Sequence, residues 1–187
     1  MASDYHFVTV WRVRGTVEEV QRVLGDGTTL PRWWPAVYLD VRVLEDPGPE
    51  SRGLGAAAEL HTTGWLPYTL RWVLRITEPM TDRGFALSAT GDLEGTGRWT
   101  FVPDGPDVVL TYDWRVRASK PLLRRLTWLL RPVFEANHHW AMARGEESLR
   151  LELQRRRATS EAERALVPPP PPPTFPALLR HTGAAAC

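Results

Sequence analysis

The stretch LRPVFEANHHWAMARGEESLRLELQ, residues 130–154, decides the fold of this chain. Apolar or small side chains recur along it every three or four positions, which is the spacing of one face of an α-helix. Asn137 and His138 are the polar interruption of that face. We therefore expect a long C-terminal helix that buries the stripe formed by Leu126, Leu130, Phe134, Ala141, Gly145, Leu149 and Leu153.

Pro132 lies inside this helical pattern. Proline removes a backbone donor and clashes with the preceding turn, so it breaks or kinks a helix. The prediction is a shorter helix over residues 121–130 and a longer one that starts at Pro132, where proline suits the first turn.

The sequence upstream alternates between apolar and polar residues, as strands of an antiparallel sheet with one solvated face do. After the first strand, Thr16 and Glu19 form a capping box that starts a short helix ending near Leu24. A second helical turn is expected over residues 29–33. The expected strands cover residues 5–13, 37–43, 56–63, 68–77, 85–89, 95–102 and 108–117.

These elements predict an α+β domain in which a curved antiparallel sheet wraps the long C-terminal helix. We expect the domain to occupy residues 1–158. Residues 159–187 contain six consecutive prolines, Pro168 to Pro173, and are predicted to be a disordered, proline-rich tail.

Composition limits the function classes. A net charge of +1 gives no indication of a nucleic-acid partner. The single cysteine, Cys187, excludes an internal disulfide, and scattered acidic residues favour neither a metal site nor a cofactor. The first residues resemble no signal peptide, so a cytoplasmic location is expected. Nine tryptophans indicate either an irregular core or a lined ligand cavity.

The order of elements resembles the START-like helix-grip superfamily (SRPBCC), including its polyketide cyclase/dehydrase-type bacterial members. Three stretches carry the resemblance: residues 7–11 with 16–20, residues 30–35 (LPRWWP), and residues 130–142 (LRPVFEANHHWAM). The resemblance implies a hydrophobic ligand cavity between helix and sheet. It does not specify an activity, because the superfamily includes lipid carriers, cyclases, hormone receptors and oxygenase subunits.

The polar point of the helix, Asn137 with His138, is the first place to look for chemistry. Histidine transfers protons near neutral pH, and one of the two side chains is expected to face the cavity. The alternative is a buried polar group bonded to a strand. The residues expected to contact a ligand are Trp34, Tyr68, Trp72, Arg98, Trp99, Tyr112, Trp114, Phe134, Asn137, His138 and Ala141.

Several of these assignments have a structural alternative. Tyr68, Trp72, Tyr112 and Trp114 fit core packing as well as cavity lining, and Arg98 fits a solvated strand face as well as a carboxylate-binding position. Glu59 and His61 face solvent if Leu60 faces the core. Arg124, Arg125 and Arg131 beside apolar residues suggest either a membrane-surface contact or, preferably, a lid helix with a solvated arginine face.

The sequence therefore favours a protein that binds a small hydrophobic molecule. The alternative is a polyketide cyclase or dehydratase that assists proton transfer with Asn137, His138, Tyr112 or Arg98. A third hypothesis is an interaction module acting through the polyproline tail. No nucleophile–base triad and no phosphate-binding glycine loop is present, and the catalytic residues are unknown.

Overall fold

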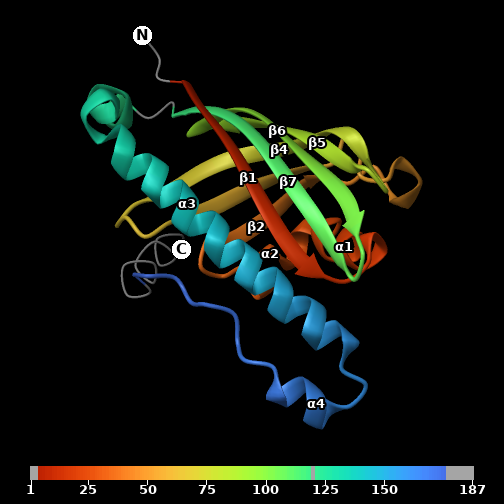
Figure 1. The fold of residues 1–187 in the computed structure, drawn as a ribbon. Coiled ribbons are helices and arrows are strands. Elements are labelled where there is room, and N and C mark those ends of the chain that lie inside the picture. Colours follow the sequence, from red (N-terminus) through yellow and green to blue (C-terminus); the bar gives the residue numbers. More distant parts are fainter. Residues whose placement is uncertain (1–3, 119–120, 176–187) are drawn as a thin grey trace, which may run out of the picture.

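The computed structural model describes the backbone of residues 4–118 and 121–175, and the side chains of residues 5–117 and 131–175. One strand precedes two short helices, six strands follow, and a long helix crosses the sheet (Figure 1). This is the predicted order. The elements are β1 (Asp4–Arg14), α1 (Val17–Leu24), α2 (Leu30–Trp33), β2 (Tyr38–Glu45), β3 (Ala57–Thr63), β4 (Thr69–Thr81), β5 (Gly84–Gly91), β6 (Leu93–Asp104), β7 (Asp107–Ala118), α3 (Pro121–Arg157) and α4 (Glu161–Leu166), with short 3₁₀ turns at Gly27–Thr29 and Pro49–Ser51.

The strands form one seven-stranded sheet in the order β1-β7-β6-β5-β4-β3-β2, and every neighbouring pair is antiparallel. Consecutive strands from β2 to β7 are neighbours; short turns join most of them, and a longer loop over residues 46–56 joins β2 to β3. The sheet curves around α3, which lies against its concave face (Figure 1). The prediction of a helix-grip α+β fold is confirmed.

The predicted capping box is present at the start of α1. The Thr16 hydroxyl accepts from the Glu19 backbone N–H at 3.3 Å, and the Glu19 carboxylate accepts from the Thr16 N–H at 2.8 Å. Arg157, the last residue of α3, donates to the same carboxylate at 2.7 Å. The capping residue therefore also holds the far end of the long helix against the start of α1.

Close packing fixes α3 at its middle. Gly145 is buried, and a β-carbon built there would lie 2.3 Å from Cζ2 of Trp34 and 2.7 Å from Cζ2 of Trp11. Only a glycine lets the helix backbone approach these indole rings so closely. Two further apolar residues of the stripe, Leu149 and Leu153, are almost completely buried.

The predicted division of this helix at Pro132 was wrong, because α3 continues from Pro121 to Arg157 with Pro132 inside it. The expected kink is visible, since the first turns lie at an angle to the rest of the helix (Figure 1). A proline removes one backbone hydrogen-bond donor, and a helix can continue past it by bending at that turn.

Near its C-terminus, α3 buries a carboxylate. Glu152 is 1% exposed and accepts from Arg32 at 2.8 Å and from Arg156 at 2.7 Å. Burial alone would raise the pKa of this carboxyl, but the bonds from Arg156 and Arg32 outweigh it and lower the pKa. Arg155 also donates to the carbonyl of Pro168 at 2.8 Å, so the chain beyond α4 contacts the end of α3.

Candidate functional site

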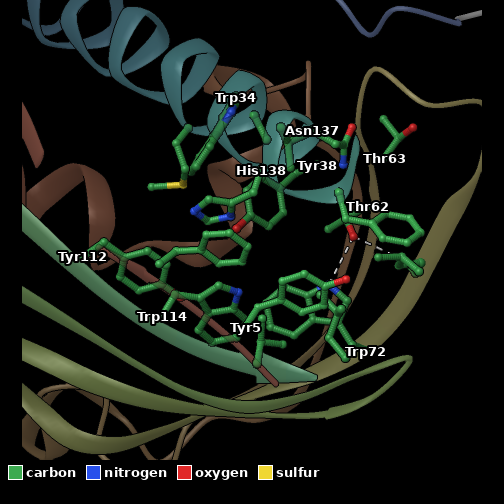
Figure 2. Close-up of a pocket in the computed structure, with 18 of the residues that line it drawn as sticks. Tyr5, Trp34, Tyr38, Thr62, Thr63, Trp72, Tyr112, Trp114, Asn137 and His138 are labelled. Atoms are coloured by element: carbon green, nitrogen blue, oxygen red, sulfur yellow. Dashed lines mark hydrogen bonds between the residues drawn. The ribbon is translucent and has the colours of Figure 1, made fainter. Parts of the chain in front are cut away.

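A cavity of about 180 Å³ lies between α3 and the concave face of the sheet. Nine of the residues predicted to contact a ligand line it, and they come from the α2–β2 and β3–β4 connections, β4, β7 and α3 (Figure 2). The structure thus brings together residues far apart in the sequence. The nine are Trp34, Tyr68, Trp72, Tyr112, Trp114, Phe134, Asn137, His138 and Ala141.

Ten further lining residues were missed by sequence reasoning. Some had a usable signal, since Tyr5 and Phe7 alternate with Thr9 and Trp11 on the inward face of β1. Others had none, because a threonine in a strand does not indicate a cavity. The ten are Tyr5, Phe7, Val37, Tyr38, Thr62, Thr63, Leu70, Leu93, Val116 and Met142.

Two of the predicted contact residues lie elsewhere. Arg98 is exposed on the outer face of β6 and donates to the carboxylate of Glu78 at 2.7 Å, so the prediction that it contacts a ligand in the cavity is corrected. The reason is strand alternation: its neighbours Gly97 and Trp99 take the inward positions. Trp99 is buried, stacks on Tyr112 with ring centroids 4.4 Å apart, and lines an adjoining cavity.

The two acid–base candidates on β3 also lie outside this cavity. Leu60 is buried, as expected, and Glu59 pairs with Arg42 at 2.8 Å. His61 is only 9% exposed, so the expectation that it is solvated was wrong. His61 does not line this cavity, although its neighbours Thr62 and Thr63 do.

The predicted lid segment contains Arg124, Arg125 and Arg131. The side chains of Arg124 and Arg125 lie outside the described residues. Arg131 is exposed, forms an ion pair with Glu135 at 2.8 Å, and places its guanidinium 5.8 Å from the centre of the Tyr5 ring. This arginine therefore lies over an aromatic residue at the rim of the cavity.

His138 faces the cavity and is held by aromatic stacking. Its ring lies nearly parallel to that of Phe7, with centroids 3.9 Å apart. Its Nε2 lies 3.4 Å from the Thr9 hydroxyl. Burial, and then the neighbouring His139, lower the pKa of His138 to about 4. The imidazole is therefore neutral near pH 7 and is a weak base.

This depressed pKa predicts a specific acid sensitivity. In the unfolded chain the His138 imidazole is protonated near its ordinary pKa of 6.5, whereas in the folded chain it is protonated only near pH 4. The contribution of neutral His138 to the free energy of unfolding is therefore fully present above that ordinary pKa. It is lost as the pH falls toward the folded-state pKa and below, by roughly 3 kcal/mol in all. Urea unfolding between pH 7 and pH 4 should show a smaller loss for His138→Gln than for the parent chain. Equal losses, or an NMR titration midpoint near 6.5, would contradict this.

Asn137 also faces the cavity, so both polar residues of the stripe point inward (Figure 2). Its Oδ1 accepts from the backbone N–H of Trp65 at 2.9 Å. The amide lies against Gly64, where a β-carbon would be 2.2 Å from Oδ1. Asn137 thus ties α3 to the β3–β4 loop, and its oxygen is already engaged.

The remaining polar side-chain groups of the cavity are hydroxyls and indole N–H groups, and Nε1 of Trp34 is buried without a partner among the described residues. Burial, and then Tyr5, raise the pKa of Tyr68 to about 12. Burial also raises the pKa of Tyr38 and of Tyr112 above the usual tyrosine range. Phenols held in this state remain protonated and donate hydrogen bonds. Thr62 is engaged, since its hydroxyl accepts from Nε1 of Trp72 at 3.1 Å.

Metal clusters and membrane spans are both absent from the described residues. In the part of the chain that the structure describes, no three histidine, cysteine or acidic side chains gather as metal ligands. No helix within the described ranges is long and apolar enough to cross a membrane.

The chain matches a known protein family over most of its length. Residues 5–154 match the family described as polyketide cyclase/dehydrase and lipid transport. The chain belongs to this family. The match spans every element from β1 through most of α3, and so includes all the elements that line the cavity. A search of curated proteins found no match.

Solved structures share the fold at low sequence identity. The ZhuI aromatase/cyclase from Streptomyces sp. R1128 superposes with a TM-score of 0.62 at 18% identity, covering 85% of this chain and 99% of that one. TTHA0849 from Thermus thermophilus gives 0.61 at 16% identity, covering 78% and 97%. A START superfamily protein from Mycobacterium smegmatis gives 0.57 at 17% identity, covering 77% and 98%. At these identities the likeness establishes the fold alone.

Proposed function

We propose that this family member binds a small, largely apolar molecule in the cavity between α3 and the sheet. The observation that carries the proposal is the chemistry of the lining: aromatic and aliphatic side chains surround a few neutral polar groups. Such a site favours neutral ring compounds, with hydroxyl donors available to a ligand oxygen. A buried anionic or cationic ligand would lack a charged partner among the described lining residues.

The test is calorimetric titration with 2-naphthol, a compact apolar ring compound with one hydroxyl. Ala141 lines the cavity, whereas Ala143 is exposed on the other side of the same helix. We expect 2-naphthol to bind the parent chain and Ala143→Leu equally. Ala141→Leu should weaken binding at least about tenfold, because the added side chain occupies the ring's space.

Failure of 2-naphthol to bind the parent chain would argue against the proposal. So would equal affinities for the two leucine variants, since binding would then not depend on this cavity. Circular dichroism and thermal unfolding of both variants check that each is folded before its affinity is compared.

Catalysis as a cyclase or dehydratase is the second candidate, supported by the convergence of Asn137, His138 and Tyr112 on one cavity. Their chemistry limits it. The Asn137 oxygen is occupied by Trp65, His138 is a weak base, and Tyr112 stays protonated. These groups orient and polarise a carbonyl more readily than they remove a proton. Turnover lost in His138→Gln with binding retained would favour the enzyme.

A further inference from the structure

A second cavity, of about 330 Å³, adjoins the first. It lies under the connection between α1 and α2 and against β2 to β6. Most of its walls are apolar, and it ends near the loop residues 25–28. The residues that line it and not the first cavity include Leu24, Ala58, Leu74, Ile76, Phe85 and Trp99.

The two cavities share part of their walls. Five residues line both of them: Trp34, Tyr38, Trp72, Tyr112 and Met142. These five come from the α2–β2 region, the sheet and α3, so only side chains separate the two spaces. Met142 is unbranched and changes its rotamer readily, which makes this boundary adaptable.

Two of the shared residues carry hydroxyls that lack partners. Among the residues the structure describes, no group hydrogen-bonds the phenol oxygen of Tyr38 or of Tyr112. The two phenols lie close enough for Tyr38 to contribute to the raised pKa of Tyr112. Neither oxygen is among the fully buried polar atoms without a partner, so both keep access to the cavity space, where a bound molecule or water can hydrogen-bond them.

The backbone makes room for one of these hydroxyls. A β-carbon at Gly97, on β6, would lie 2.5 Å from Oη of Tyr112. Glycine therefore allows the phenol to lie flat across the neighbouring strand, where it stacks between Trp99 and Trp114 at 4.4 and 5.6 Å. The hydroxyl is held in place at the boundary between the two cavities.

We propose that the two cavities are compartments of one binding site for an elongated molecule with two apolar ends joined through an oxygen acceptor. Each end occupies one compartment, and Tyr38 and Tyr112 donate to the oxygen between them. This inference rests on the proposed function, because the first compartment must bind an apolar ring for the second to add to it.

The experiment compares three probes by calorimetry. Chalcone has two aryl rings joined through a ketone, trans-stilbene has two aryl rings without the ketone, and 2-naphthol fits one compartment. We expect the parent chain to prefer chalcone over trans-stilbene about tenfold. Tyr38→Phe and Tyr112→Phe should each weaken chalcone about threefold to tenfold and leave trans-stilbene unchanged.

Two variants fill the second compartment from different strands. Ala58→Leu and Leu74→Phe should each weaken both two-ring probes about tenfold and leave 2-naphthol unchanged. The use of two positions keeps the test valid if one variant does not fold. Ala141→Leu, in the first compartment, should weaken all three probes.

The outcomes separate the two proposals. Binding of 2-naphthol together with two-ring affinities that neither Ala58→Leu nor Leu74→Phe changes would overturn the two-compartment site and leave the proposed function standing. Equal affinities for chalcone and trans-stilbene would overturn the role of the tyrosine pair. Absence of 2-naphthol binding to the parent chain would instead overturn the proposed function itself.

Discussion

Replacing Trp11 with alanine is expected to lower the free energy of unfolding by about 3 to 5 kcal/mol, the range for truncating a large buried aromatic residue. Trp11 is 1% exposed. Its ring lies 5.4 Å from that of Trp34 and 4.9 Å from that of Trp99, and it packs on the α3 backbone at Gly145. The side chain therefore joins β1 to α2, β6 and the long helix at one point.

Urea unfolding at pH 7 measures this loss, and Val10→Ala is the matched control. Val10 neighbours Trp11 on the same strand but is 59% exposed on the outer face. Its truncation should change stability by less than about 0.5 kcal/mol. Similar losses for the two variants would show that Trp11 does not join these elements.

Trp11→Phe should cost less than Trp11→Ala. The indole Nε1 of Trp11 is buried and has no hydrogen-bond partner within the described residues. Phenylalanine keeps most of the apolar contact and removes that unpaired donor, which partly offsets the lost volume. A cost of about 1 to 2 kcal/mol is expected from the same unfolding measurement.

Gly145→Ala is expected to destabilise the protein by about 1 to 3 kcal/mol, although alanine favours a helix interior over glycine by about 1 kcal/mol. The net change in the free energy of unfolding is nevertheless a loss, because the new methyl group would lie 2.3 Å from Cζ2 of Trp34. Both Trp34 and Trp11 are buried and cannot move aside without disturbing their neighbours. Either the helix or the rings must shift.

Ala143→Gly is the control, since Ala143 is exposed on α3 and only helix propensity changes there. It should lose about 1 kcal/mol. Chemical denaturation of both variants decides the point: a Gly145→Ala protein more stable than the parent would contradict the close approach. Because Trp34 lines the cavity, its displacement should also change the affinity for 2-naphthol.

Local periodicity predicted which side of most strands faces the core. Tyr112 and Trp114 were expected on the apolar face of their strand, and both are buried there. The same alternation, applied with Trp99 inward, would have placed Arg98 outside. Gly95 and Gly97, just before Arg98 in the same strand, made that assignment uncertain, because glycine often marks an irregular strand. Gly97 in fact keeps the regular register, opposite Trp114.

The predicted capping box was confirmed, whereas the predicted helix break at Pro132 was wrong. The two signals differ in how far along the chain the groups that decide them lie. The capping box involves residues three apart, so the sequence contains all of its partners. The effect of Pro132 depends on what supports the surrounding turns, and α3 remains one helix across it. His61 is likewise buried, although alternation along its own strand predicted a solvated position.

By itself, the sequence determined the order of the elements, the apolar face of most strands and the polar interruption at Asn137 and His138. Those features follow from contacts and periods within one element. Only the tertiary structure decided that both polar residues line the cavity, that Asn137 is engaged by Trp65, and that Tyr38 and Tyr112 each line two adjoining cavities. A cavity forms where the curved sheet and the crossing helix do not touch, and the spacing of residues within one element does not specify where elements meet.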